Sequence, residues 1–271
     1  MLSTRIFTAL IGIPIIFVCI YFGGIIFTVM MGAVSFFCVW EYMTISQKYN
    51  PHKILSVIMS VLFFILLSFS QYVHHAMAAA VVMLFILFAA EVFGKNTDMC
   101  VARISVSFLG AFLLPAALAH MVYIRNLYGS GSGGAGMKLI FFVFITVWVL
   151  DTAAYAFGKM LGKHKLAPNV SPKKTVEGAV AGVLFGVLTA VLCRYIFMTD
   201  LLSVGSAVIL GIVISVIGQF SDLAESLIKR DANIKDSGTI IPGHGGFLDR
   251  FDSYIFAAPA VFYTLLFFFV H

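Results

Sequence analysis

Charged side chains are scarce in this sequence. Asp, Glu, Lys and Arg make up 11% of its 271 residues, whereas they form about 25% of a soluble domain. So few charges could not cover a surface that faces water, which excludes an ordinary soluble protein. Apolar residues are correspondingly abundant, at 61% of the chain, with a mean hydropathy of +1.05. We therefore expect the chain to fold in a lipid bilayer.

Cysteine is rare as well, and the four cysteines form no pattern that indicates chemistry. Cys19, Cys38, Cys100 and Cys193 stand singly in apolar segments, with no CxxC motif and no Cys/His pairing. This spacing argues against a disulfide framework and gives no support to a zinc site. We expect these side chains to be small buried apolar groups.

The apolar runs are long and do not alternate with polar residues. Lipid-facing backbone must satisfy its own hydrogen bonds, so runs of roughly 16–25 apolar residues predict membrane-spanning helices and not a barrel. The expected fold is an all-α polytopic integral membrane protein with about nine transmembrane helices, forming a single membrane domain over residues 1–271. The nine expected spans cover residues 5–20, 24–45, 54–70, 74–94, 103–125, 139–161, 172–198, 202–229 and 250–270.

The helices up to about residue 125 are expected to form a scaffold, and those within 139–270 are expected to carry the active site. Gly23 and Gly24 are expected to separate the first two spans, because a single crossing cannot hold about 40 residues.

The net charge of +5 could suggest a nucleic-acid partner, but the basic residues lie in short segments between apolar runs. With the N-terminus inside, all of the 17 lysines and arginines except Arg125, Lys138 and Arg194 fall on one side. This asymmetry is typical of a cytoplasmic face and predicts no nucleic-acid binding. The two long hydrophilic inserts, 162–174 and 230–249, fall on that face. The short chain, without an N-terminal extension, favours the bacterial plasma (inner) membrane over an organelle.

A first candidate site lies where a predicted helix begins. Ser171 is a suitable N-cap and Pro172 a suitable first helical residue, which places Lys173, Lys174 and Thr175 in the first turn. Free N–H groups and two lysines at a helix N-terminus favour an anion, above all a phosphate. The alternative is an ordinary helix cap whose lysines only mark the cytoplasmic side.

Asp151 lies well inside an apolar run, where a carboxylate costs roughly 2.5–3.5 kcal/mol on insertion scales. Tyr155 and Gly158 share its helical face. We interpret Asp151 as functional, with a buried bond to a neighbouring helix as the alternative.

A second candidate site begins on the predicted span before the last. Asp222, Ser226 and Lys229 follow one another at i, i+4 and i+7, and Glu225 reaches Lys229 at i+4. One helical stripe therefore carries an acid, a hydroxyl and a base where the helix leaves the membrane.

Two further acids, Asp249 and Asp252, stand at the head of the last span, with Arg250 between them. Together with Asp222 and Asp151 they could build an all-oxygen site for Mg²⁺. This ion usually binds few protein ligands and takes its remaining ligands from phosphates and water.

Residues 238–246, the glycine-rich loop, separate these two helices. Its four glycines allow a sharp turn that points N–H groups, those of Gly245 and Gly246 among them, at an anion. His244 is a candidate phosphate ligand or proton carrier.

These segments resemble the signature of the phosphatidate cytidylyltransferase (CDP-diacylglycerol synthase) family. The resemblance rests on residues 226–230 (SLIKR), 235–238 (KDSG) and 242–252 (PGHGGFLDRFD). Residues 171–178 (SPKKTVEG) are similar to a further family segment, with Val176 in place of an aromatic residue.

The resemblance implies the reaction of CTP with phosphatidate to give CDP-diacylglycerol and pyrophosphate, with Mg²⁺ and with a second metal ion left open. It also implies a largely helical membrane protein, often a homodimer, in which Asp222 and Asp249 are the leading metal ligands. The expected catalytic residues are Asp222, Lys229, Arg230, Lys235, Asp236, His244, Asp249 and Arg250. The expected phosphate-binding residues are Ser171, Lys173, Lys174, Thr175, Ser226, Gly245 and Gly246. The expected metal ligands are Asp222, Asp249, Asp151 and Asp252.

Two rival functions stay open at this point. An ion-coupled transporter could use the intramembrane acids Glu41, Glu91, Asp151, Glu177 and Asp222 as a path. It would not explain why the candidate chemistry gathers in two inserts on one side. The second rival function is that of a related membrane enzyme, such as a polyprenol kinase or a cytidylyltransferase for an isoprenoid or ether lipid.

Overall fold

The computed structural model describes residues 2–69, 75–94, 97–129, 134–243 and 245–268. It is 80% helical, as expected for a chain whose backbone must bond internally in lipid. The chain forms two compact units. Unit 1 comprises Met1–Val122 and Asp231–Phe251, and unit 2 comprises Tyr123–Arg230 and Asp252–His271.

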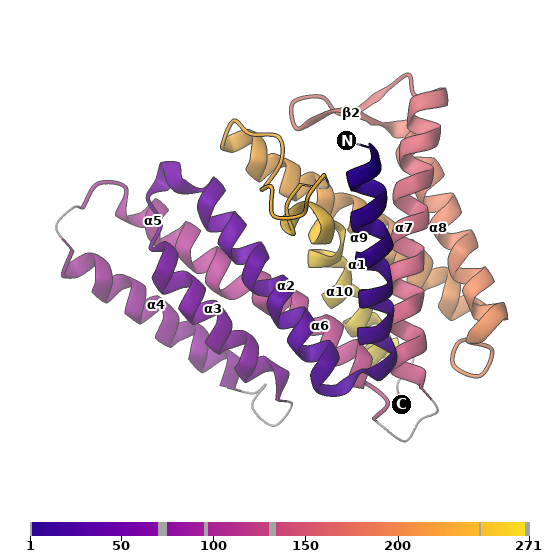
Figure 1. Cartoon of the computed structure of the whole chain (residues 1–271), viewed down its shortest axis with the longest axis horizontal. Coiled ribbons are helices and arrows are strands. Elements are labelled where there is room, and N and C mark those ends of the chain that lie inside the picture. Colours follow the sequence, from indigo (N-terminus) through magenta and orange to yellow (C-terminus); the bar gives the residue numbers. More distant parts are fainter. Residues whose placement is uncertain (1, 70–74, 95–96, 130–133, 244, 269–271) are drawn as a thin grey trace. The chain divides into compact units, whose positions relative to one another are not determined.

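Unit 1 is built from the N-terminal helices (Figure 1). They are α1 (Leu2–Phe22), α2 (Gly24–Ile45), α3 (Lys53–Ser68), α4 (Ala76–Val92) and α5 (Cys100–Phe108), which continues through a π-helical turn (Leu109–Leu113) into α6 (Leu114–Asn126), whose last residues, from Tyr123 on, belong to unit 2. Gly23 and Gly24 have positive φ angles of 61° and 50°, which confirms the predicted break between α1 and α2. At the π-helical turn, a Cβ on Gly110 would meet Tyr42 at 2.7 Å, so the glycine lets α2 pack closely there.

Unit 2 contains α7 (Ala135–Leu161), β1 (Lys165–Ala167), β2 (Ser171–Thr175), α8 (Val176–Phe197), α9 (Val204–Asp231) and most of α10 (Leu248–Phe268). Helices α7 and α8 run side by side (Figure 1). Glycines permit this approach, because a Cβ on Gly178 would lie 2.6 Å from the carbonyl oxygen of Ala154. A Cβ on Gly211 would similarly lie 2.8 Å from Cβ of Ala190, which keeps α9 close to α8.

Each expected span coincides with a helix to within a few residues. Six helices in the described part of the chain are long and apolar enough to cross a membrane: α2, the continuous helix Cys100–Asn126, α7, α8, α9 and α10. The apolar helices Leu10–Phe22 (within α1), α3 and α4 are shorter. The chain is therefore a multi-pass helical membrane protein, while nine crossings stay a prediction.

The predicted helix start at Ser171 is wrong. Residues Ser171–Thr175 form strand β2, which pairs antiparallel with β1 and places Lys165 opposite Thr175. A residue before proline favours an extended backbone, which explains the conformation of Ser171 before Pro172. The helix begins at Val176 and is capped by Thr175, whose hydroxyl accepts a hydrogen bond from the N–H of Gly178 at 3.2 Å.

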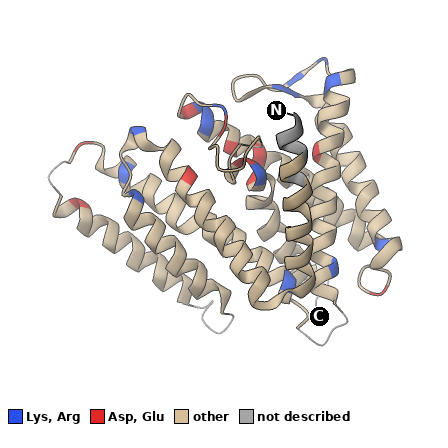
Figure 2. Cartoon of the chain, in the orientation of Figure 1, with Lys and Arg blue, Asp and Glu red and all other residues tan. Residues whose placement is uncertain are grey.

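Basic residues of unit 2 gather at one end of its helices (Figure 2). Lys159 lies in the last turn of α7, and Lys165, Lys173 and Lys174 follow on the β1–β2 hairpin. The opposite end of α8 carries Arg194. Within unit 2 this distribution agrees with the predicted charge asymmetry.

Candidate active site

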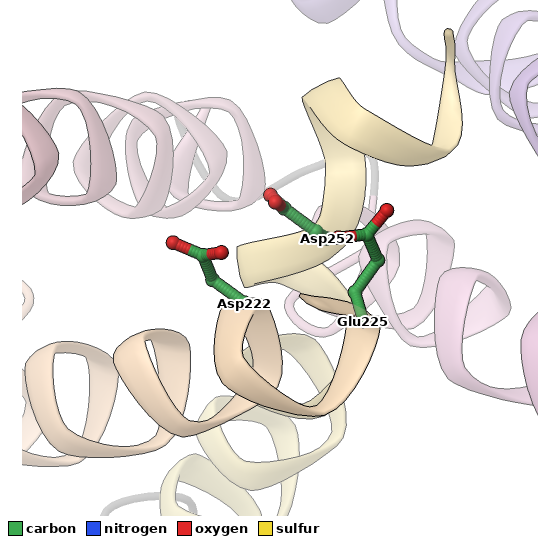
Figure 3. Close-up of side chains that lie close together, drawn as sticks. All are labelled: Asp222, Glu225 and Asp252. Atoms are coloured by element: carbon green, nitrogen blue, oxygen red, sulfur yellow. The ribbon is translucent and has the colours of Figure 1, made fainter. Parts of the chain in front are cut away.

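Three carboxylates of unit 2 lie together: Asp222 and Glu225 from α9 and Asp252 from α10 (Figure 3). One oxygen from each lies within 4.8 Å of the others, and we call this group the carboxylate cluster. Asp222 and Glu225 share a face because they stand at i and i+3. The hydroxyl of Ser221 joins the two helices. It donates to the carbonyl oxygen of Asp252 and accepts from the N–H of Phe256 at 3.2 Å.

Two ammonium groups pair with the carboxylate cluster. Nζ of Lys174 lies 2.6 Å from Oδ2 of Asp222, and Nζ of Lys229 lies 2.7 Å from Oε2 of Glu225. Carboxylates this close repel one another when all are ionised, so the adjacent cations stabilise the arrangement. The predicted Glu225–Lys229 pair is confirmed. The contact of Lys174 also brings the first candidate segment to the second, which their separation in sequence did not indicate.

The donor set of the carboxylate cluster fits a hard divalent cation. All its ligand atoms are carboxylate oxygens, and Mg²⁺ is commonly held by one or two carboxylates together with phosphates and water. Asp222 and Asp252 were expected as ligands, whereas Glu225 was recognised only as the partner of Lys229. Its i, i+3 spacing from Asp222 was the signal in the sequence that could have placed it in the metal site.

A cavity of about 630 Å³ lies beside Asp222 in unit 2. This volume is typical of small-molecule sites. Predicted site residues line it: Asp151, Ser171, Lys173, Lys174, Thr175 and Asp222. Lys159, Lys165 and Gln219 line it as well. Four lysines and two acids thus face one cavity, which suits a ligand with several phosphate groups.

The β1–β2 hairpin, which carries three of these lysines, is held by contacts near its turn and at its base. Nε of Arg230 donates to the carbonyl oxygen of Val170 at 3.0 Å. The carboxylate of Glu177 accepts hydrogen bonds from the N–H of Lys163 at 3.0 Å and from the ring of His164 at 2.6 Å. Arg230, expected to be catalytic, therefore also positions the hairpin. Glu177 was not among the expected site residues.

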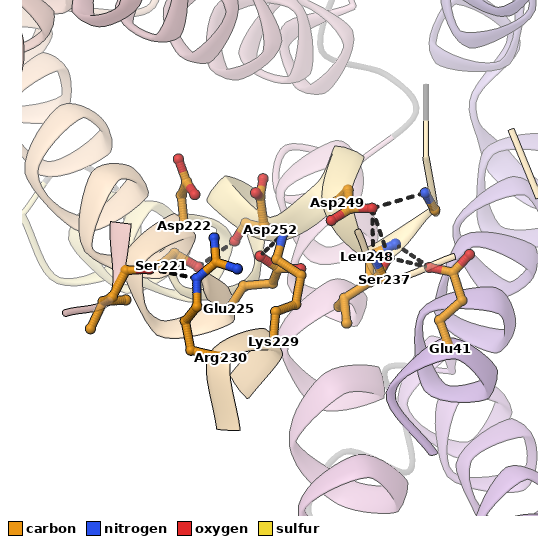
Figure 4. Close-up of polar contacts among 12 residues, drawn as sticks. Glu41, Ser221, Asp222, Glu225, Lys229, Arg230, Ser237, Leu248, Asp249 and Asp252 are labelled. Atoms are coloured by element: carbon orange, nitrogen blue, oxygen red, sulfur yellow. Dashed lines mark hydrogen bonds and ion pairs between the residues drawn. The ribbon is translucent and has the colours of Figure 1, made fainter. Parts of the chain in front are cut away.

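In unit 1, Asp249 organises the glycine-rich loop (Figure 4). Its Oδ2 accepts hydrogen bonds from the N–H of Ser237 at 2.8 Å and the N–H of Gly246 at 2.9 Å, and it lies 3.0 Å from the hydroxyl oxygen of Ser237. Gly243 and Gly245 have φ angles of 78° and 86°, which confirms the predicted need for glycine at the turn. His244 lies outside the described residues.

A second cavity, of about 430 Å³, is lined by Asp236, Arg250 and the glycine-rich loop, including Gly245. Lys235 has an exposed side chain, and Ser226 is buried on α9.

The expectation that Asp222 and Asp249 share one ion stays a prediction, since the two residues belong to different units.

The comparisons with known proteins agree with the resemblance seen in the sequence. Residues 3–269 match the model of the cytidylyltransferase family. A phosphatidate cytidylyltransferase from Staphylococcus saprophyticus is 34% identical over 265 residues, which cover 95% of this chain and 96% of that protein. Phosphatidate cytidylyltransferases from Staphylococcus haemolyticus and Staphylococcus epidermidis are each 37% identical over 179 residues, or 66% of this chain and 65% of theirs. The chain belongs to the cytidylyltransferase family.

Proposed function

We propose that this protein transfers the cytidylyl group of CTP to phosphatidate, giving CDP-diacylglycerol and pyrophosphate for phospholipid biosynthesis. The observation that carries the proposal is the match over nearly the whole chain to relatives with this named activity. The cavity of unit 2 supports it, because it joins several lysines to the carboxylate cluster in a membrane-spanning helical unit.

The reaction requires a phosphate oxygen of phosphatidate to attack the α-phosphorus of CTP. A new P–O bond forms, and the bond to the β-phosphate breaks as pyrophosphate leaves with the electron pair. The attacking phosphate is already largely ionised, so the reaction needs no strong base. The protein must hold two anions together and offset the charge that develops. Lys159, Lys165, Lys173 and Lys174 are the cavity-lining cations available for this purpose.

We also propose that Mg²⁺ binds at the carboxylate cluster, with Asp151 and Asp249 as further candidate ligands and a second ion left open. When bound, the ion would neutralise phosphate charge and favour departure of pyrophosphate. Asp222, Glu225 and Asp252 supply oxygen ligands for it. Lys174 and Lys229, which contact these acids, would then stand next to the nucleotide phosphates.

The proposal includes a bacterial plasma membrane with the active site facing the cytoplasm, and a homodimer. CTP is a soluble, highly charged molecule, whereas phosphatidate keeps its acyl chains in the bilayer. The lysine-rich end of unit 2 is the natural place for the two to meet, since positive residues favour the cytoplasmic side.

The contacts of the intramembrane acids argue against the transporter. Glu91 pairs with Arg103 at 2.5 Å and with His52 at 2.7 Å. Glu177 holds the hairpin, and Glu41 accepts backbone hydrogen bonds from the start of α10. These contacts give three of the five acids structural partners, which accounts for these acids without a role in ion transport.

The test is an assay of the purified protein in vesicles that contain phosphatidate, with CTP labelled in the cytidine ring. We expect the label to appear in a lipid that is absent when phosphatidate is omitted. Vesicles with a polyprenol or polyprenyl phosphate in its place provide the comparison. Labelling only in those vesicles, or ion flux without labelled lipid, would contradict the proposal.

A further inference from the structure

We infer that Glu41, on the second helix of the chain, is a positioning residue that holds the glycine-rich loop and, with it, Asp249. The inference rests on the proposed function, because it treats the glycine-rich loop and Asp249 as parts of the active site. It assigns a role to an acid that the proposed reaction does not otherwise use.

Both oxygens of the Glu41 carboxylate accept hydrogen bonds from the segment that surrounds the glycine-rich loop (Figure 4). Oε1 accepts from the N–H of Phe247 at 3.1 Å, and Oε2 accepts from the N–H of Leu248 at 2.9 Å. Leu248 is the first residue of α10, where N–H groups have no partner inside the helix. A carboxylate from α2 therefore serves as the cap of α10, where the helix dipole favours negative charge.

Glu41 also binds the other end of the glycine-rich loop. Its Oε2 accepts a hydrogen bond from the hydroxyl of Ser237 at 2.8 Å, and the same hydroxyl lies 3.0 Å from Oδ2 of Asp249. The N–H groups of Ser237 and Gly246 both donate to this Asp249 oxygen. Glu41 and Asp249 thus hold the same two ends of the loop, joined through one serine hydroxyl.

Two glycines of the loop make room for this carboxylate. A Cβ on Gly238 would lie 2.6 Å from Oε1 of Glu41, and a Cβ on Gly246 would lie 2.2 Å from Oε2. Contacts that short are not tolerated by real side chains, so the backbone of the loop approaches Glu41 as closely as only glycine allows. Gly238 and Gly246 therefore leave room for the Glu41 carboxylate, in addition to allowing the loop to turn.

The ring of Phe247 adds an apolar contact on the same face of α2. It stacks on Phe37 with ring centroids 4.7 Å apart and planes at 16°. Phe37 and Glu41 stand at i and i+4, so they share one face of the helix. The helix therefore contacts both the side chain and the backbone N–H of Phe247.

Burial makes these contacts necessary for Glu41. The residue is 2% exposed and lies within a membrane-spanning helix. An ionised carboxylate is tolerated there only when hydrogen bonds or charges compensate for lost water. A cap with a merely structural role would meet this need as well, so the test must separate folding from turnover.

The experiment compares Glu41→Gln with Glu91→Gln, a matched change of another buried acid of unit 1 that instead pairs with Arg103 and His52. Gln keeps the size of Glu but loses the charge and one acceptor oxygen. In Glu41→Gln we expect hydrogen exchange of the amides in 235–248 to rise about tenfold or more. We expect kcat per folded molecule to fall on the order of 10–100-fold, as for a displaced catalytic group, with a smaller change in KM for CTP. Glu91→Gln should lower Tm and leave both quantities unchanged.

Ser237→Ala removes only the bridging hydroxyl. It should also raise hydrogen exchange in the loop and lower kcat, by less than Glu41→Gln does. This variant replaces Glu41→Gln as the test if Glu41→Gln does not fold. Wild-type loop exchange or wild-type kcat in the folded variants would overturn the inference. If the wild-type protein makes no CDP-diacylglycerol, the proposed function fails, and the exchange comparison still decides whether Glu41 orders the loop.

Discussion

At the scale of single residues, the candidate active site is defined by acids that pair with lysines. Asp222 and Glu225 lie one turn apart on α9, and each has its own lysine, Lys174 or Lys229. The ion pair of Glu225 with Lys229 was predictable, because residues four apart on a helix lie next to each other. The pair of Asp222 was not, since its partner is 48 positions away and reaches it only through the β1–β2 hairpin.

Asp222→Asn and Asp252→Asn should each lower turnover by at least about 10²-fold, since metal charge stabilisation supplies several kcal/mol and 1.36 kcal/mol is tenfold. Asn keeps the shape of Asp but is a weaker ligand for a hard cation. Asp249→Asn should have a similar effect. The measurement is kcat against Mg²⁺ concentration, with the half-saturating Mg²⁺ concentration expected to rise.

Asp231→Asn is the control for these substitutions. Asp231 is exposed and pairs with Lys48 at 2.6 Å and with the hydroxyl of Tyr49 at 2.9 Å, neither of which belongs to the carboxylate cluster. Its loss should leave kcat nearly unchanged, because exposed ion pairs contribute little. Normal Mg²⁺-dependent turnover in Asp222→Asn, with loss of turnover in Asp231→Asn, would refute the metal site.

Lys173→Ala and Lys174→Ala should each reduce kcat/KM for CTP or phosphatidate by about tenfold or more, as expected for loss of a charged phosphate contact. Lys173 is exposed in the cavity, whereas Lys174 also contacts Asp222. Protein yield and Tm should stay close to wild type for Lys173→Ala. An unchanged kcat/KM in both single variants and in the double variant would remove the hairpin from the phosphate site.

At the scale of elements, the helices were predictable and the hairpin was not. Long apolar runs in lipid leave the backbone no other regular structure, so residues such as those of α7 and α8 could be assigned directly. Ser171 before Pro172 fits a helix cap and an extended residue equally well. The pairing of β2 with β1 decided between them, and that pairing depends on contacts formed only in the folded unit.

Close packing of α7 and α8 gives a prediction at this scale. Gly178→Ala would place a Cβ 2.6 Å from the carbonyl oxygen of Ala154 and 2.9 Å from Cα of Gly158, both backbone atoms that cannot move alone. Overpacking of this kind typically costs about 1–3 kcal/mol. We expect a lower Tm in detergent and reduced turnover. Gly12→Ala, which meets nothing within 4 Å, should keep or raise Tm. Equal Tm values for the two variants would contradict the packing account.

At the scale of the whole molecule, the chain leaves unit 1 after Val122 and returns to it at Asp231. The sequence predicted an N-terminal scaffold and a C-terminal active site. It could not predict that α2 would hold the glycine-rich loop, because Glu41 and Leu248 are 207 positions apart. The N-terminal helix α2 therefore contributes directly to the arrangement of a candidate active-site loop.

The proposed orientation predicts where reagents can reach the two hydrophilic inserts. After replacement of the four native cysteines, single cysteines placed in 163–170 and in 232–240 should react with impermeant reagents only from the cytoplasmic side. A cysteine at 199–202, in the turn between α8 and α9, should react only from the opposite side. Labelling of either insert from outside intact cells would contradict a shared cytoplasmic active site.

The central claim is that a cytidylyl group moves to phosphatidate, and the position of a phosphorus label tests it most directly. CTP labelled at the α-phosphorus and CTP labelled at the γ-phosphorus are incubated separately with the protein in phosphatidate vesicles. The account predicts that the α label enters the lipid, that the γ label leaves in pyrophosphate, and that Asp222→Asn nearly abolishes both. A γ label in the lipid would identify a kinase, and no label in the lipid from either nucleotide would contradict the transferase.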